Sequence, residues 1–369
     1  MAQVSRTRRL ISEDAPEPEA TLALAPEGPL VTPGFHPLAD FANFGPGEAL
    51  MLLESGTDLD VFTRSIAGSA CSYLSSRLPR AGISGANVDR EALEEWLSRS
   101  SSGPFDEGFA GWLRDLTHVD GGATFPGVNI ALPPQMIVGL MAWLQGELLF
   151  ALGDVSDTIT LSGIGGIWMD ELMLQLGIML EPVLTSPKGP RDYSGHQAEL
   201  HPYADLAGFG PSEGKMLGET GSLLAPAASG VISLAYTYLL SRPESAGFFS
   251  ESDHLAQRKQ TLKAWWIRTA ADPYETNGGF GDYLRKVANA HVLNAGTHPG
   301  VEIPPQLTIA LMGWVEMRVM TALNTIALDP AGAATFGELG DPGALAAVGR
   351  TWMQMLTLQL GVLIDPYLT

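Results

Sequence analysis

Two histidines stand at corresponding places in a repeated segment and could each hold a metal ion. His118 opens the stretch HVDGGATFPGVNI, and His291 opens HVLNAGTHPGVEI. A neutral imidazole is a common metal ligand. At the end of a helix it can instead act as a cap, because the helix dipole favours a cation there. Which role applies depends on the elements that position each histidine.

The chain repeats itself over most of its length. HPLADFANFGPGEALML begins at His36 and HPYADLAGFGPSEGKML at His201, an offset of 201 − 36 = 165. LQLGIMLEPVL begins at Leu174 and LQLGVLIDPYL at Leu358, an offset of 358 − 174 = 184. Such a long period indicates a duplicated domain with loop insertions. We expect domains over residues 35–184 and 196–369, a disordered tail over residues 1–34 and a linker over residues 185–195.

Composition narrows the class of protein. With 45% apolar residues, the 369-residue chain can bury two ordinary cores. A formal net charge of −20 makes nucleic acid or an anionic membrane surface an unfavourable partner. Cys71 is the single cysteine and no signal peptide is visible, which together favour a reducing cytoplasm. The most apolar run, residues 130–152, contains Gln145 and Glu147, so we interpret it as a buried helix rather than a membrane span.

Helical spacing dominates within each copy. In residues 231–240 the apolar side chains fall three and four apart, and the segment around Trp352 does the same. The pairs Pro133-Pro134 and Pro304-Pro305 mark helix starts, because proline is tolerated only in the first turn. The prediction is an all-α chain with about seven helices per copy.

The order of segments in the second copy resembles the protoglobin or globin-coupled sensor family, a branch of the globin fold. YTYLLSRPESAGFF is followed by HLAQRKQTLKAWWIRTAADPY, then by YLRKVANAHVLNAG, then by the Pro-Pro helix start. The resemblance covers roughly residue 223 to the C-terminus, and it reaches the first copy only through the internal repeat. It implies two tandem globin domains packed as a pseudo-twofold pair.

The resemblance also implies haem b as the cofactor. His291 matches the proximal iron ligand of the family, which leaves the opposite position open for a diatomic gas. Tyr236 falls on the distal tyrosine position, with a packed core aromatic as the alternative. Thr261 matches a position that faces the ligand in some members, with an exposed helix residue as the alternative. Phe248 matches an aromatic that packs near the haem, and Trp265 is expected in the wall or core.

The first copy keeps the histidine but differs at other positions of the predicted site. His118 aligns with His291, but Cys71 stands where the second copy has Tyr236, and Ala92 stands where it has Thr261. The segment before His118 is also shorter, so the helix that carries it should have lost about one turn. His118 could cap that helix, hold haem in a more apolar pocket, or belong to a degenerate copy that serves only for packing. The interpretation favours haem in both copies, and more strongly in the second.

Both copies depart from the family after the ligand histidine. An insertion precedes Pro304, which puts the proximal hydrogen bonding in question, and it adds His298 as a rival ligand ranked below His291. Family members usually dimerise through their last two helices. Here residues 304–323 and 344–363 could form the same four-helix bundle with residues 133–152 and 164–180 inside one monomer.

Three functions remain open. A haem protein could bind a diatomic gas as sensor, carrier or scavenger, with a separate signalling partner because no output segment is expected after the second copy. A haem enzyme could act on O2, peroxide or an N–O small-molecule substrate. A haem-free globin scaffold could serve protein recognition.

Overall fold

The computed structural model describes residues 31, 35, 38–42, 44–120, 122–184, 203–249, 252–271, 279–293, 303–329 and 340–368. The predicted tail and linker lie outside these residues, apart from Val31. We call residues 31–184 the N-terminal half and residues 203–368 the C-terminal half.

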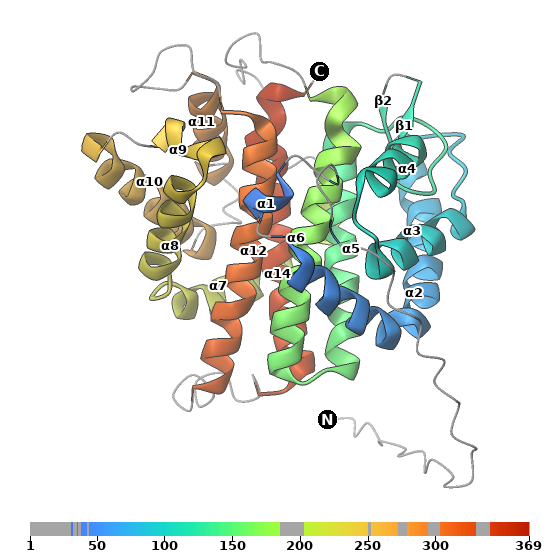
Figure 1. Ribbon diagram of the computed structural model, residues 1–369, viewed down its shortest axis with the longest axis horizontal. Coiled ribbons are helices and arrows are strands. Elements are labelled where there is room, and N and C mark those ends of the chain that lie inside the picture. Colours follow the sequence, from blue (N-terminus) through green and yellow to red (C-terminus); the bar gives the residue numbers. More distant parts are fainter. Residues whose placement is uncertain are drawn as a thin grey trace, which may run out of the picture.

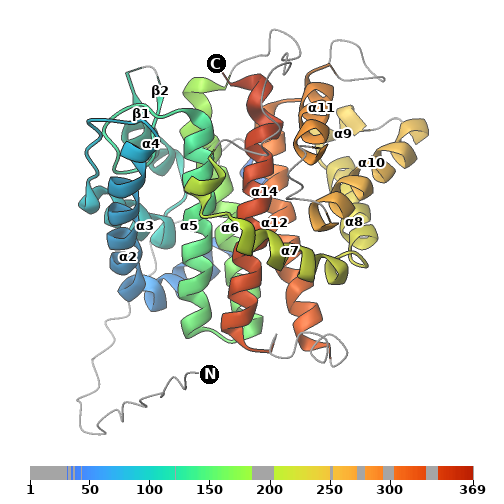
Figure 2. The same cartoon turned by 180° about the vertical axis from the view of Figure 1, so that it is seen from behind.

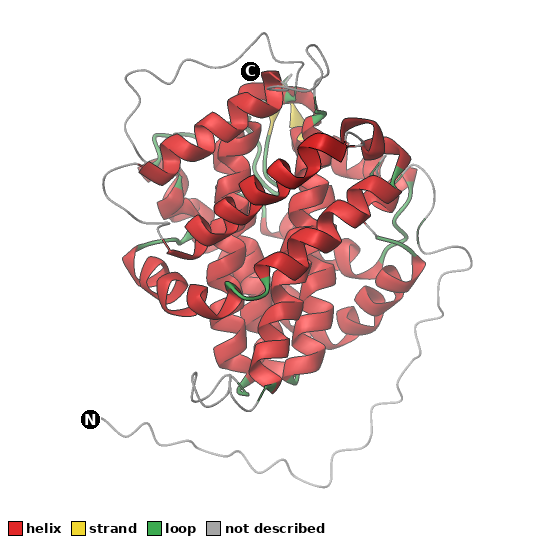
Figure 3. Ribbon diagram, turned by 90° about the vertical axis from the view of Figure 1, so that its left-hand side faces the viewer, coloured by secondary structure: helices red, strands yellow, loops and turns green. Residues whose placement is uncertain are grey.

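Helices make up nearly all of the described chain (Figure 3). The elements of the N-terminal half are α1 (Ala39–Ala42), α2 (Pro46–Arg80), α3 (Arg90–Ser102), α4 (Glu107–Thr117), β1 (His118–Val119), β2 (Gly122–Ala123), α5 (Pro134–Val155), α6 (Thr158–Leu180) and η1 (Glu181–Val183). Those of the C-terminal half are η2 (Ala204–Ala207), α7 (Pro211–Leu224), α8 (Ala228–Ser241), α9 (Pro243–Phe249), α10 (Ser252–Ala271), α11 (Gly279–Leu293), α12 (Pro305–Leu328), α14 (Pro342–Ile364) and η3 (Asp365–Tyr367). The all-α prediction is confirmed except for the small β1–β2 hairpin.

Helix boundaries follow the chemistry of the chain. Helices α5 and α12 begin at Pro134 and Pro305, as predicted, because proline there gives up only a backbone N–H that a first turn leaves unpaired. Helix α2 runs unbroken for 35 residues. The corresponding segment of the C-terminal half is broken into two helices, α7 and α8, which meet at 81°. Pro226 lies between them, and proline cannot continue the helical hydrogen-bond ladder. The halves therefore differ by one helix near this point.

The four longest apolar helices, α5, α6, α12 and α14, form a central bundle. Figures 1 and 2 show it between α2–α4 on one side and α7–α11 on the other. The closest packing crosses between the halves: α6 lies along α12, and α14 lies along α5. At Gly153 of α5 an added Cβ would lie 2.7 Å from the Cβ of Ala346 in α14, so glycine is required for this approach. The bundle predicted within one chain is confirmed.

One bundle helix also has the length and composition of a membrane span. Among the described residues this is α5 alone, while α7 and α8 pass the same test only as a pair, despite their sharp bend. In α5, 83% of the most apolar window is buried inside the protein. Its apolar surface is therefore covered by neighbouring helices such as α14 and α6.

Two tyrosines connect the halves in the same way. Tyr73 of α2 stacks on Trp143 with ring centroids 4.4 Å apart, and its hydroxyl donates to the carbonyl of Leu206 in η2 at 3.0 Å. Tyr238 of α8 stacks on Trp314 at 5.5 Å and donates to the carbonyl of Phe41 in α1. The offsets agree, since 238 − 73 = 165 and 206 − 41 = 165. Each half thus holds the first short helix of the other.

Candidate functional site

Tyr236 lies in the buried face of α8. Its side chain is 6% exposed, and burial raises the pKa of its phenol to about 12, although Arg258 acts in the opposite direction. The phenol therefore keeps its proton at neutral pH and can donate a hydrogen bond. The ammonium of Lys259 in α10 lies 5.9 Å from the ring centroid. A neutral donor thus sits beside a positive charge where α8 meets α10.

Helix α10 changes character along one of its sides. Thr261 and Trp265 are four residues apart and so lie on nearly the same side of the helix. Trp265 is buried and donates from Nε1 to Oε1 of Gln359 in α14 at 2.6 Å. Thr261 is exposed, and its hydroxyl donates to the carbonyl of Gln257 at 3.1 Å. This side of α10 is therefore buried against the protein at Trp265 and exposed to solvent at Thr261. Trp265 belongs to the core.

Helices α10 and α11 face each other near Thr261. The hydroxyl of Tyr283 in α11 donates to the carbonyl of Thr261 at 3.4 Å, and the guanidinium of Arg268 lies 4.6 Å from the Tyr283 ring. His291 follows Tyr283 by eight residues, about two turns, and lies in the last turn of α11. The backbone thus carries His291 on the helix opposite α10.

Several predicted residues cannot be placed in full. The side chains of His291 and Phe248 lie outside the described residues, although α11 and α9 include their backbones. His298 lies wholly outside them. Their proposed roles stay predictions. Among the described residues, no three His, Cys, Asp or Glu side chains are grouped closely enough to hold a metal ion.

His118 does not offer its Nε2 to a metal. It ends α4 and begins β1, where it pairs with Ala123. Its Nε2 lies 2.9 Å from the carbonyl oxygen of Ile178 in α6. Because a carbonyl only accepts, Nε2 carries the proton and has no lone pair for iron. This contact and the position of His118 at the end of α4 agree with the capping alternative, and the haem role of His118 stays a prediction.

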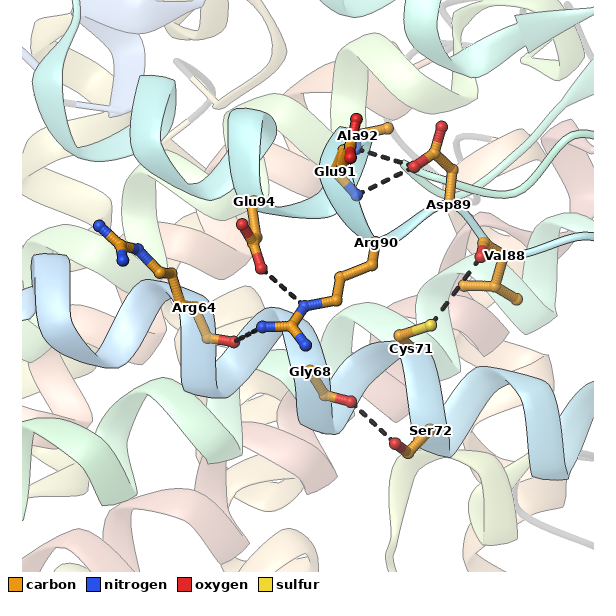
Figure 4. A network of polar contacts seen from close by, with 10 residues as sticks. All are labelled: Arg64, Gly68, Cys71, Ser72, Val88, Asp89, Arg90, Glu91, Ala92 and Glu94. Carbon is orange, nitrogen blue, oxygen red and sulfur yellow. Dashed lines mark hydrogen bonds and ion pairs between the residues drawn. The ribbon is translucent and has the colours of Figure 1, made fainter.

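Other residues near the predicted site of the N-terminal half also have their own contacts. Helix α4 has 11 residues against 15 in α11, a difference of 15 − 11 = 4, which confirms the predicted loss of one turn. The thiol of Cys71 donates to the carbonyl of Val88 at 3.8 Å, just before Asp89 caps α3 (Figure 4). Phe125 packs edge-on against Trp96, with ring centroids 5.4 Å apart. Cys71 thus contacts a loop carbonyl, and Phe125 lies against Trp96.

Both halves contain a buried tryptophan–glutamine network that the sequence analysis missed. Trp96 donates to Gln175 at 2.5 Å, and the amide of Gln175 donates to Ser100 at 2.9 Å. In the C-terminal half Gln359 accepts from Trp265, and its amide donates to Thr269 at 3.2 Å. The sequence did contain a sign of this network. Both copies have a glutamine in the apolar segment LQLG, and a buried amide requires hydrogen-bond partners.

Three buried carboxyl groups were missed as well: Asp170 and Glu171 in α6, and Glu316 in α12. Burial raises the pKa values of Glu171 and Glu316 to about 8, and it raises that of Asp170 well above its ordinary value. Neither Oδ1 of Asp170 nor Oε2 of Glu171 has a hydrogen-bond partner among the described residues. All three lie in the bundle and not beside Tyr236.

Comparison with known protein families finds a match in the C-terminal half. A Protoglobin family domain covers residues 196–369. This is a globin-type family that typically binds haem and diatomic gases. No curated protein and no solved structure matches the chain. Of the candidate residues, His291, Tyr236, Thr261, Trp265 and Phe248 lie inside the Protoglobin domain, whereas His118 and Cys71 lie outside it.

Proposed function

We propose that the C-terminal half is a haem b protein that binds a diatomic gas, with His291 as the iron ligand and Tyr236 on the gas side. The observation that carries the proposal is the buried, protonated phenol of Tyr236 inside the Protoglobin domain. Haem would supply an iron with one open coordination position. The phenol would donate a hydrogen bond to a ligand held there.

The described residues of the C-terminal half are compatible with such a group. Helix α10 faces α11, which carries His291 in its last turn, and the α10 side chain at Thr261 is exposed. Thr261 would border the space between these helices, and Phe248 would lie near it. Trp265 would act indirectly, by holding α10 on α14 through Gln359.

We propose that the N-terminal half is a second globin copy that binds no haem. The repeated tyrosine and tryptophan contacts support a common origin of the halves. The bond between His118 and Ile178 supports the loss of its iron site. Its role would be to complete the bundle that a dimer supplies in the family, so we expect a monomer in solution. The single free thiol, Cys71, supports a cytoplasmic location.

A haem-dependent enzyme is the second candidate, because of the charge beside Tyr236. Four basic residues lie in α10, although the chain has a net charge of −20: Arg258, Lys259, Lys263 and Arg268. Such a positive region favours an anionic substrate over a neutral gas. Steady consumption of nitrite, an anion, by the reduced protein would favour this function over simple binding.

Optical titration tests the first candidate. Protein purified after haem supply should show a Soret band, and this band should shift reversibly when CO is added to the reduced protein. A shift without net turnover supports gas binding. A colourless protein, with the fold intact by circular dichroism, would leave only the haem-free scaffold.

A further inference from the structure

A three-residue hydrogen-bond ring lies inside the central bundle. Its members are Gln145 of α5, Glu316 of α12 and Thr357 of α14, all with 0% exposure. The Gln145 amide donates from Nε2 to Oε2 of Glu316 at 2.9 Å. The hydroxyl of Thr357 lies 2.6 Å from Oε1 of Gln145 and 2.8 Å from Oε1 of Glu316. The ring joins one helix of the N-terminal half to two of the C-terminal half.

Proton counting fixes the state of the carboxyl group. The ring has three contacts between electronegative atoms, and each contact at these distances needs one proton. Gln145 can supply one within the ring, and the hydroxyl of Thr357 supplies one. The third can come only from Glu316. The count is the same if the amide of Gln145 is turned over, because its N–H then serves Thr357 and Glu316 must donate to its oxygen.

We propose that Glu316 is a buried proton-binding site whose neutral carboxylic acid closes this ring and thereby connects the two halves. If Glu316 were ionised, one contact would lack its proton, and two lone pairs would face each other in a buried site. The connection therefore holds while the proton is bound and weakens when it is lost.

The charged surroundings agree with a neutral acid. From α6, Asp170 lies beside Gly313 of α12, whereas Glu171 is bonded to Gln175 on the side that packs against α3. A charge on Glu316 would raise the pKa of the buried Asp170 further, so a neutral Glu316 avoids repulsion between two buried carboxylates. The charges on α5 and α14 are engaged with each other, since Arg350 lies 3.3 Å from Glu147. Arg318 of α12 lies over the ring of Trp314 at 5.0 Å. No cation forms an ion pair with Glu316 among the described residues. Burial raises its pKa to about 8, although its hydrogen-bond contacts with Thr357 and Gln145 act in the opposite direction.

The position of the ring explains why it could serve both halves. Gln145 stands 145 − 134 = 11 residues after the start of α5, and Glu316 stands 316 − 305 = 11 residues after the start of α12. They are therefore corresponding residues that meet across the bundle. Two glutamates would place two buried acids there, whereas the glutamine–glutamate pair needs only one proton beyond those of the amide and hydroxyl groups.

Infrared spectroscopy tests the proposal on the full chain. In the variant Asp170→Asn/Glu171→Gln, a carboxylic-acid C=O band should remain at pH 7 and shift in D2O. Adding Glu316→Gln should abolish it, while adding Glu147→Gln, the control, should not. A folded Asp170→Asn/Glu171→Gln protein without such a band would overturn the proposal.

A second variant tests the proposal if the Asp170→Asn/Glu171→Gln protein does not fold. Thr357→Val in the otherwise natural chain removes the acceptor of the Glu316 proton, so the acid band should move to higher frequency. Thr351→Val is the matched control, because its hydroxyl bonds to Ala347 on the same helix and not to Glu316. Identical acid bands in the two valine variants would show that Glu316 carries no proton.

Discussion

The indole of Trp265 donates to Gln359 at 2.6 Å, and Trp96 makes the corresponding bond to Gln175 at 2.5 Å. The offsets are 265 − 96 = 169 and 359 − 175 = 184. A bond preserved through two different insertions fixes the same pair of helices in each half, α10 on α14 and α3 on α6. It therefore holds in place the helix that would form one wall of the haem site.

Replacing Gln359 with leucine should destabilise the protein by about 1–3 kcal/mol, because the Trp265 N–H would stay buried without an acceptor. Urea unfolding measures the change. Gln175→Leu should cost a similar amount, since its network is equivalent, whereas a leucine on the exposed surface should cost little. Equal stability of Gln359→Leu and the natural protein would contradict a structural role for the bond.

The tyrosines that connect the halves should contribute separately. Tyr73→Phe and Tyr238→Phe each remove a hydrogen bond to the other half, to Leu206 and Phe41, and each should cost about 1 kcal/mol. The double variant should show the sum, because the residues share no partner. Thermal unfolding of the four proteins provides the measurement, and a markedly larger effect of the pair would mean that the two contacts are coupled.

The stability of the chain should fall as pH rises above about 4.5 and level off above about 8. Glu171 has an ordinary pKa of 4.5 that burial raises to about 8, so the folded state keeps a proton that the unfolded state has lost between these values. Each such carboxyl lowers the folding equilibrium constant by about tenfold per pH unit in this window.

Glu171→Met gives this prediction a specific test. Methionine is the natural residue at the corresponding position 355, since 355 − 171 = 184. In this variant the free energy of unfolding should fall less steeply with pH, by the contribution of one proton. Urea unfolding at a series of pH values measures the slope. The exposed, ion-paired Glu95→Gln is a suitable control and should leave the slope unchanged. A slope unaltered by Glu171→Met would mean that Glu171 is ionised in the folded protein.

Removal of the Tyr236 hydroxyl should affect gas binding and leave the fold intact. Tyr236→Phe keeps the buried ring but loses the donor, so a bound diatomic ligand should dissociate about five- to tenfold faster. The natural Tyr238 lies two residues away and donates to α1 instead, so Tyr238→Phe serves as the control. Stopped-flow ligand displacement compares the two, and equal rates would remove Tyr236 from the gas side.

The sequence predicted what local chemistry determines. The helix starts at Pro134 and Pro305 follow from the missing proline N–H, and the shorter helix before His118 follows from counting residues. The sequence did not predict which distant residue each side chain contacts. Nothing in HVDGG reveals that a hairpin turns His118 towards Ile178, because that bond depends on α6, sixty residues away. The protonation of Glu316 likewise depends on residues from two other helices.

The haem content of three proteins tests the central claim most directly: the natural chain, His291→Ala and His118→Ala, each supplied with excess haem and freed of unbound pigment. The account predicts one haem per chain in the natural protein and in His118→Ala, and none held by iron ligation in His291→Ala. Two haems per chain, or full pigment in His291→Ala with loss in His118→Ala, would contradict it.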